Sequence, residues 1–196
     1  MTVPLRPLAV SLRPLTAADG EVIAGWAQDP DFCRAAEWST ALSQVEHRDF
    51  QRRTITSPPP DLLRLAAEQE GRLVGYVDLH GTEAGRRELG FLVGPRSLWG
   101  RGLGLALARS GVAHGFAVLG LREIWAEAIG ANRASVRILQ RLGMTETGQG
   151  QPASYLGQPS HYRRFALGST SWDHARLRPT HATSASRAES TWSTTP

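Results

Sequence analysis

The stretch from Arg86 to Met144 constrains the fold more than any other part of the chain. An apolar strand runs into a glycine-rich turn, Trp99-Gly-Arg-Gly-Leu-Gly104, and the turn opens a helix rich in small residues. The first amide groups of such a helix have no carbonyl partner, so they and the positive end of the helix dipole point at one place. The stretch therefore predicts a binding site for a phosphate group at the start of this helix.

Periodic patterns around the turn predict a mixed α/β fold. Four segments alternate in the manner of strands: 62–69, 72–79, 87–93 and 122–129. Weaker signals predict a first strand, two helices and two final strands: 10–15, 16–29, 41–55, 145–150 and 161–167. A Glu70-Gly71 turn joins the first two of the four segments as a hairpin, which disfavours a wholly parallel sheet.

For two helices beside these strands, the sequence predicts a packing face or the residues that cap the ends. Small residues recur along one face of the helix over 103–119: Gly104, Ala108, Gly111 and Gly115. A face without side chains can lie close against a sheet, and close packing would offset the roughly 1 kcal/mol that each glycine costs a helix. Asn132 is expected to cap the next helix, and Gly143 suits the left-handed position that ends one.

Taken in order, these pieces resemble the GNAT family of N-acetyltransferases, and in particular its Rim-type branch, which acetylates the N-termini of ribosomal proteins. The resemblance covers about residues 10–178 and rests on five stretches: 12–19, 88–93, 99–104, 119–126 and 132–144. It implies a twisted mixed sheet with helices on both faces, splayed between the strands of Glu88 and Ile124. It also implies direct transfer of an acetyl group from acetyl-coenzyme A to a primary amine.

Length and composition set further limits. The 196 residues have room for one domain, expected over 1–178, followed by a tail at 179–196 that is too poor in apolar residues to pack. The single cysteine, Cys33, excludes an internal disulfide framework and a four-cysteine zinc site, and no metal site is expected. No stretch is apolar enough for a membrane span or a signal peptide, so we expect a cytoplasmic protein without a membrane partner.

Charge is distributed unevenly along the chain. Residues 1–90 carry 10 arginines against 13 acidic residues, whereas residues 91–196 carry 12 against 5, and lysine is absent. The acidic half contains the segments where the family admits its acceptor, and the basic half contains the predicted phosphate-binding turn. Scattered, solvated charge is the alternative interpretation.

The resemblance assigns coenzyme A to the glycine turn and its neighbours. Backbone N–H groups of one run of residues would bind the pyrophosphate: Arg101, Gly102, Leu103, Gly104, Leu105 and Ala106. The N–H groups of Leu92 and Val93 would stabilise the developing oxyanion. Asn132 and Ser135, which match the Asn-x-x-Ser pattern of the Rim-type branch, complete the expected cofactor set.

Glu88 is the first candidate for the general base. It lies on the strand that the family places beside the thioester, where a carboxylate accepts a proton from the incoming ammonium. The alternative is that Glu88 is solvated or pairs with a neighbouring arginine, and Glu127 is the second candidate base. Many family members protonate the leaving thiolate with a tyrosine, but Leu139 stands at that position here. Ser135 is the expected alternative donor, unless water suffices.

Acidic and aromatic residues of the N-terminal half are expected to meet the acceptor: Asp31, Glu37, Trp38, Asp78 and His80. The resemblance favours a protein N-terminus as acceptor, and an aminoglycoside, a polyamine or another small amine fits the acidic half as well. The protein is expected to act as a monomer or homodimer.

Other functional classes fit the sequence less well. A dinucleotide-binding dehydrogenase would need glycine where the fingerprint reaches Leu105 or Leu107, and a Walker-type nucleotide site would need a lysine. Nucleic-acid binding is not expected, because the arginines are interspersed with packing residues. The surviving alternative of another class is an acyl-coenzyme-A-binding sensor that has lost turnover, which the missing tyrosine suggests.

Overall fold

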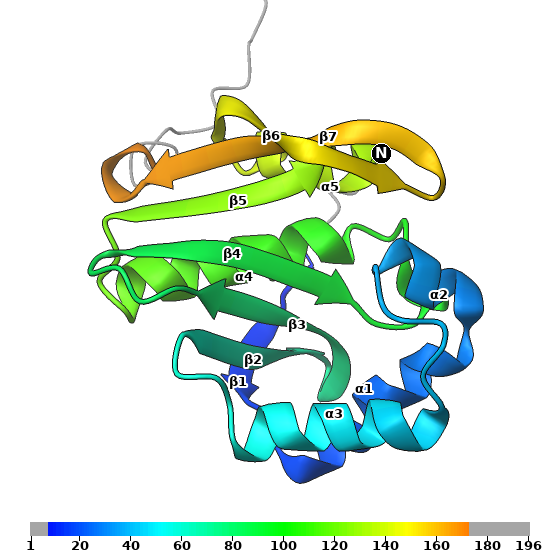
Figure 1. The fold of residues 1–196 in the computed structure, drawn as a ribbon. Coiled ribbons are helices and arrows are strands. Elements are labelled where there is room, and N and C mark those ends of the chain that lie inside the picture. Colours follow the sequence, from blue (N-terminus) through cyan, green and yellow to red (C-terminus); the bar gives the residue numbers. More distant parts are fainter. Residues whose placement is uncertain (1–7, 173–196) are drawn as a thin grey trace, which may run out of the picture.

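A seven-stranded sheet forms the centre of the protein, in a computed structural model that describes residues 8–172 (Figure 1). The strands are β1 (Ser11–Pro14), β2 (Leu62–Gln69), β3 (Arg72–His80), β4 (Arg86–Val93), β5 (Glu123–Ile129), β6 (Thr145–Tyr155) and β7 (Gln158–Gly168). Their order across the sheet is β1-β2-β3-β4-β5-β7-β6, and β4 and β5 are the one parallel pair among these strands. The predicted mixed sheet is confirmed.

The sheet opens between β4 and β5. Their pairing begins with Arg86 opposite Glu123 and ends with Glu88 opposite Trp125. Past Glu88 the two strands diverge, while β4 stays paired with β3 as far as Val93 (Figure 1). The expected splay is therefore present, and it leaves one edge of β4 open.

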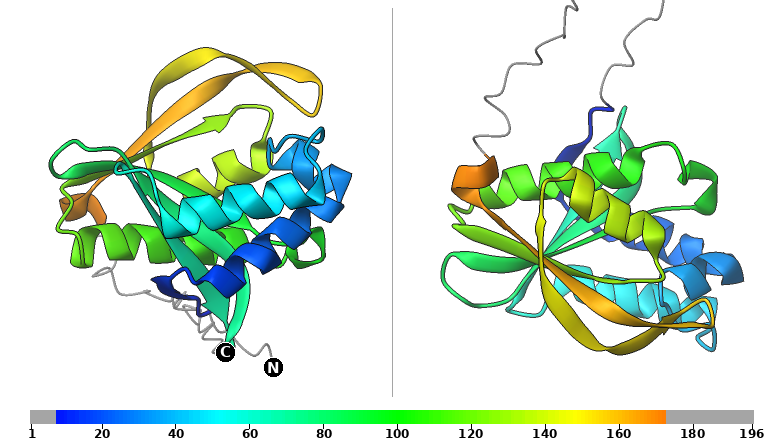
Figure 2. Two further views of the ribbon diagram at one scale, coloured as in Figure 1. Left: turned by 60° about the horizontal axis from the view of Figure 1, so that its bottom comes forward. Right: turned by 90° about the horizontal axis from the view of Figure 1, so that it is seen from above.

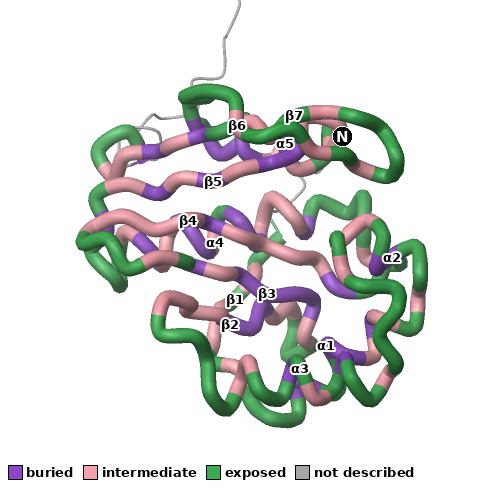
Figure 3. Tube along the Cα trace, viewed as in Figure 1, coloured by how far each residue is buried: buried purple, intermediate pink, exposed green. Residues whose placement is uncertain are grey.

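Helices cover both faces of the sheet, α4 and α5 on one side and α1, α2 and α3 on the other (Figure 2). Their bounds are α1 (Ala17–Gly25), α2 (Pro30–Ala35), α3 (Gln44–Thr56), α4 (Leu103–Ala117) and α5 (Arg133–Arg141), with 3-10 turns at Trp26–Gln28 and Arg96–Leu98. The sheet separates two hydrophobic cores, and alternate side chains of β3 point into one or the other. Val77 packs in the core beneath α4, whereas Tyr76 packs with Ile23 on the opposite face. Buried positions follow the strands and the inward faces of the helices (Figure 3).

The segment after the first helix differs from the prediction. It was expected to be a loop up to residue 41, but it begins with α2, for which Asp29 is the N-cap and Pro30 stands in the first turn. An N-cap aspartate followed by proline is a helix-start signal, and the prediction took it for a helix end. The next helix, α3, starts at Gln44, where Ser43 forms a capping box.

The last two strands are longer than predicted. β6 and β7 form a hairpin over Thr145–Tyr155 and Gln158–Gly168, and two register shifts in β6 accommodate residues that interrupt the strand pattern. A short helical turn at 169–172 contains Trp172. The disordered tail predicted over 179–196 lies outside the described residues.

The small-residue face of α4 lies against the sheet, as predicted. A Cβ on Gly111 would lie 2.6 Å from Val77 Cγ1 and 2.8 Å from Leu89 Cδ1, and a Cβ on Gly115 would lie 2.7 Å from Ile124 Cδ1. These distances are shorter than van der Waals contacts in a packed interior, so the glycines set how closely α4 approaches β3, β4 and β5.

Gly111→Ala is expected to lower the free energy of unfolding by about 1–3 kcal/mol, because overpacking outweighs the roughly 1 kcal/mol that alanine adds to a helix. Gly25→Ala is the matched control. Gly25 is helical (φ −59°) and a Cβ there would meet nothing within 4 Å, so the same change should raise stability. Thermal unfolding of both variants checks the prediction, and a Gly111 variant as stable as the native protein would contradict the close packing.

Candidate functional site

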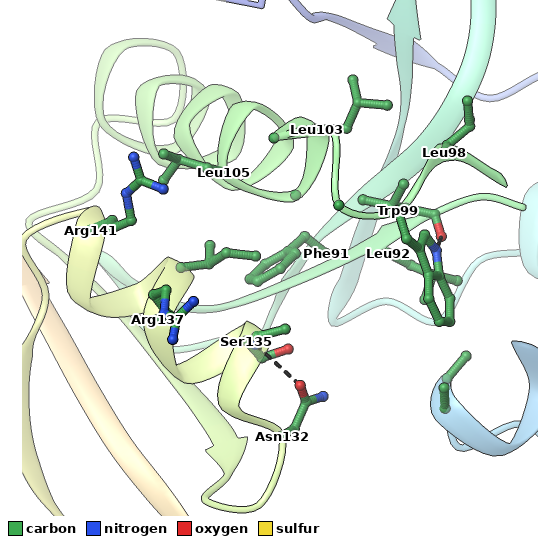
Figure 4. A pocket seen from close by; sticks show the side chains of 18 of the residues that line it. Phe91, Leu92, Leu98, Trp99, Leu103, Leu105, Asn132, Ser135, Arg137 and Arg141 are labelled. Atoms are coloured by element: carbon green, nitrogen blue, oxygen red, sulfur yellow. Dashed lines mark hydrogen bonds between the residues drawn. The ribbon is translucent and has the colours of Figure 1, made fainter. Parts of the chain in front are cut away.

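A cavity of about 390 Å³ lies where β4 parts from β5 (Figure 4). It is bounded by the end of β4, by the glycine turn with the first turn of α4, and on the far side by α5. Ala35 and Ala36 at the end of α2, and Tyr155 at the tip of the β6–β7 hairpin, complete the lining. The cavity thus occupies the one place in the described sheet where neighbouring strands separate.

The glycine turn leads into α4 through a left-handed backbone. Gly100 (φ +73°) and Gly102 (φ +85°) lie in the region where a side chain is strained, and Gly102 is the N-cap of α4. The Gly102 carbonyl accepts the N–H of Ala106 at 3.3 Å. This is the first bond of the helix, so the N–H groups of residues 103–105 have no partner within the helix. Residues 103–105 line the cavity, and their free N–H groups are the donors that an anion-binding site requires.

The open edge of β4 offers further backbone donors. The N–H of Gly94 bonds to strand β3 at 2.7 Å, so the alternation of an antiparallel ladder points the N–H of Leu92 at β3 as well. The N–H groups of Phe91 and Val93 then point into the gap. Trp99 agrees with this assignment, because its indole N–H donates to the carbonyls of Val93 (3.2 Å) and Gly94 (3.0 Å).

Helix α5 forms the far wall of the cavity. Asn132 caps it, its Oδ1 accepting the N–H of Ser135 at 3.2 Å, as predicted (Figure 4). Arg137 and Arg141 line the same cavity, are exposed, and form no ion pair within residues 8–172. Two unpaired guanidinium groups beside a helix N-terminus suit a phosphorylated ligand.

Most of the predicted cofactor residues meet in this cavity: Leu92, Val93, Gly102, Leu103, Gly104, Leu105, Asn132 and Ser135. Arg101 and Ala106 are not among the residues that line it. Phe91, Arg137 and Arg141 are additions to the predicted set. The spacing of the two arginines, four apart on one helix face, was the signal in the sequence that could have identified them.

Glu88 stands on the face of β4 that turns away from α4, at the last position paired with β5. Among residues 8–172 it is the one partly buried carboxylate that has neither a hydrogen bond nor an ion pair. Arg86 pairs instead with a β5 carboxylate at 2.6 Å, and Arg87 donates to backbone carbonyls. Burial, and then the Glu127 carboxylate, raise the pKa of Glu88 against a smaller lowering by His80.

The other predicted polar residues near Glu88 already have partners. Three pairs account for them: Glu127 with Arg164, Asp78 with Arg64 at 2.7 and 2.8 Å, and His80 with Asp61 at 3.0 Å. A carboxylate held by an arginine has its oxygens engaged and is not free to contact an incoming ammonium. Of the predicted candidate bases, Glu88 is the one without a partner among the described residues.

Glu37 and Trp38 lie on the side of the sheet that Glu88 faces, where Trp38 packs with Tyr76 and Leu92. Glu37 is exposed as a whole residue, but its carboxylate is partly buried, and this burial raises its pKa. Burial raises the pKa of Tyr155, with a smaller contribution from Glu37. Burial also raises the pKa of Tyr162, which in addition feels the charges of Glu37 and Glu88. Tyr162 therefore lies within reach of the charges of both Glu37 and Glu88.

Asp31 lies apart from this group. It pairs with Arg34 and, at 3.0 Å, with Arg96, which also holds Asp29 at 2.5 Å. Asp29 in turn accepts the N–H groups of Asp31 and Phe32 at the start of α2. The network fastens α2 to the loop after β4, so Asp31 supports a wall of the cavity.

Within residues 8–172, no three or more His, Cys, Asp or Glu side chains are grouped so that they could hold a metal ion. Over the same residues, the helices are too short or too polar to span a bilayer.

Comparison with solved structures finds the same fold in several acetyltransferases. Spermidine N-acetyltransferase from Vibrio cholerae, in complex with coenzyme A and spermine, is 18% identical with a TM-score of 0.70, over 83% of this chain and 97% of that chain. RimL, a ribosomal α-N-protein acetyltransferase in complex with coenzyme A, is 16% identical with a TM-score of 0.69, over 83% and 96%. An aminoglycoside acetyltransferase in complex with coenzyme A is 20% identical with a TM-score of 0.67, over 86% and 99%.

At these identities the structures establish the fold, and their different acceptors leave the acceptor of this chain open. A family model described as an acetyltransferase (GNAT) domain matches residues 10–145. Since this match spans well over half of the sequence, we conclude that the chain belongs to the GNAT acetyltransferase family.

Proposed function

We propose that the protein transfers the acetyl group of acetyl-coenzyme A directly to a primary amine, with Glu88 as the general base. The protein is an N-acetyltransferase by family, and acetyl-coenzyme A is the cofactor of that family. The observation that carries the mechanism is the partly buried, unpartnered carboxylate of Glu88, at the point where β4 and β5 part.

The cavity beside the glycine turn has the donors that coenzyme A requires. The amide groups of residues 103–105, with Arg137 and Arg141, would hold its phosphates. The N–H groups of Phe91 and Val93 would hold its amide arm along the open edge of β4. When bound, the cofactor supplies an acetyl group activated as a thioester.

Proton transfers can be assigned to Glu88 and to hydroxyls that line the cavity. Glu88 would take the proton of the incoming ammonium, and its raised pKa brings it nearer to that of an α-amino group, about 8. Ser135 and Tyr155 line the cavity and supply hydroxyls that can protonate the leaving sulfur. Burial raises the pKa of Tyr155, which keeps that hydroxyl protonated.

The surroundings of Cys33 favour direct transfer over a covalent enzyme intermediate. Cys33 is buried, and its thiol lies 3.5 Å from the carbonyl oxygen of Ala27. Burial raises the pKa of this thiol, and a buried thiol with a raised pKa is a poor acetyl carrier. We also propose a cytoplasmic location, with which a single buried cysteine is compatible.

A protein N-terminus is the acceptor that we favour, on the resemblance to the Rim-type branch and the similarity to RimL. The spermidine and aminoglycoside acetyltransferases of the same fold make small amines the alternative.

Calorimetry with acetyl-coenzyme A, followed by release of free thiol in the presence of N-terminal peptides and small amines, tests the proposal. Tight binding, with thiol released for some acceptors only, is the expected result. Tight binding without release for any amine would favour a sensor of the same fold. No binding would overturn the assignment of the cavity to coenzyme A.

A further inference from the structure

A second cavity, of about 310 Å³, lies against α3 and beside the first. Tyr76 lines the second cavity and pairs across β3 and β4 with Leu92, which lines the first. Ala36 lines the first cavity and the next residue, Glu37, lines the second. The two cavities are therefore neighbours, and an acceptor that reaches the first has an adjacent cavity for the rest of the molecule.

Aromatic side chains form much of the wall of this second cavity. Trp38 stands edge-on to Phe32 (5.2 Å between ring centroids) and stacks on buried His47 (5.8 Å). His47 Nε2 lies 3.1 Å from the Ser39 carbonyl oxygen, and since a carbonyl only accepts, this nitrogen donates the hydrogen bond. Phe50 lies at the rim and is half exposed. The cavity therefore offers fixed aromatic faces, which attract cations.

Gln51 adds an unsatisfied acceptor to the wall. Its side chain is 2% exposed, and its Oε1 has no hydrogen-bond partner among the described residues. Unpaired buried oxygens are costly and rare in native structures. Because Gln51 lines the cavity and the terminal torsion of a glutamine amide is broad, rotation of the amide can bring this oxygen to a donor bound there.

The charges of the wall favour a cation. Arg64 is already neutralised, because two hydrogen bonds tie it to Asp78 and its guanidinium lies 4.0 Å over the Tyr76 ring. Glu37, in contrast, forms no hydrogen bond or ion pair within residues 8–172. Its backbone is at φ +58°, a left-handed conformation that few non-glycine residues adopt and that often marks functional positions.

From these contacts we infer that the second cavity binds a second cationic nitrogen, carried by the amine acceptor on an apolar stem. Glu37 and the Gln51 oxygen are its partners, and the stem lies against Trp38 and Phe50. The inference rests on the proposed function and narrows its acceptor class. Such a group occurs in a small diamine and in a basic side chain next to a peptide N-terminus.

Equilibrium binding tests the cavity without requiring turnover. The coenzyme-A-loaded protein is titrated with pentane-1,5-diamine and with hexylamine, which carries a methyl group in place of the second ammonium. A second pair of peptides, Ala-Lys-Ala and Ala-norleucine-Ala, makes the same comparison for a basic side chain. In at least one pair the cationic member is expected to bind about tenfold more tightly, as a charged hydrogen bond implies.

Substitutions connect this preference to the cavity. Glu37→Gln removes the charge and Gln51→Met removes the acceptor at similar length, so each is expected to bring the ratio of the two dissociation constants close to one. Glu70→Gln is the matched control. Glu70 is also a glutamate at positive φ (+51°) without a partner among the described residues, but it lies in the β2–β3 turn, so the ratio should stay as in the native protein.

The outcomes distinguish a small diamine from a basic peptide side chain, and they distinguish failure of this inference from failure of the proposed function. A preference confined to the diamine pair identifies a small diamine, and one confined to the peptide pair identifies a basic side chain; either supports the inference. Equal binding within both pairs, or a preference that survives both substitutions, would overturn it and leave ordered water as the occupant. If the cationic member binds preferentially but no acceptor releases thiol, the inference holds and the proposed function fails.

Discussion

Gly102→Glu is expected to weaken binding of acetyl-coenzyme A by at least about 100-fold, because it places a negative charge where the phosphates bind. Gly102 is the N-cap of α4 at φ +85°, and the free amide groups of the helix follow it directly. Like charges 4 Å apart repel by about 4 kcal/mol at an effective dielectric constant of 20. The new side chain also fills the approach that a phosphate needs. Calorimetric titration measures the loss.

Gly71→Glu separates this effect from backbone strain. Gly71 has a similar left-handed backbone (φ +74°) with open space at the Cβ position, and it lies in the β2–β3 turn. Both variants should lose about 1–2 kcal/mol of stability to the strained conformation. Only the Gly102 variant should lose affinity. If it binds the cofactor as the native protein does, the phosphates do not lie at the glycine turn.

Local chemistry made the cofactor side of the site predictable. A glycine turn that opens a helix, and an asparagine such as Asn132 that caps one, are properties of a few consecutive residues. The choice between Leu92 and Phe91 as an N–H donor is different, because it depends on the register of β4 against β3. Tyr155 is placed by a hairpin whose length depends on register shifts that the sequence pattern does not reveal.

The acceptor side was harder to predict because its carboxylates are distinguished by distant partners. Asp78 is occupied by an arginine 14 residues away, Glu127 by one 37 residues away and Asp29 by one 67 residues away. Sequence can therefore propose Glu88 and Glu127 on equal terms, and only the folded chain shows which of the two has a partner. For the same reason the second cavity, assembled from α3, β2 and β3, is not visible in any single stretch.

Glu88→Gln is expected to reduce kcat/KM by about 100- to 10,000-fold below the pKa of the acceptor amine, with the dissociation constant of acetyl-coenzyme A unchanged. In the native enzyme, activity should fall at low pH as Glu88 takes up a proton. Burial and Glu127 raise the pKa of Glu88, so this fall lies above the usual carboxylate range, and the variant should lack it. As pH passes an amine pKa of about 8, the amine is neutral without a base, so the deficit should shrink. Thiol release across pH measures both profiles.

Glu127→Gln distinguishes the two candidate bases. The charge of Glu127 raises the pKa of Glu88, so its removal should move the acid limb of the native profile to lower pH. The rate should fall far less than in Glu88→Gln, because Arg164 already holds the Glu127 carboxylate. A loss as large as that of the Glu88 variant would transfer the base to Glu127. If the native enzyme and Glu88→Gln show the same pH profile, Glu88 is not the base. Water would then accept the proton of the ammonium group, and Glu88 would only lie near the reacting amine.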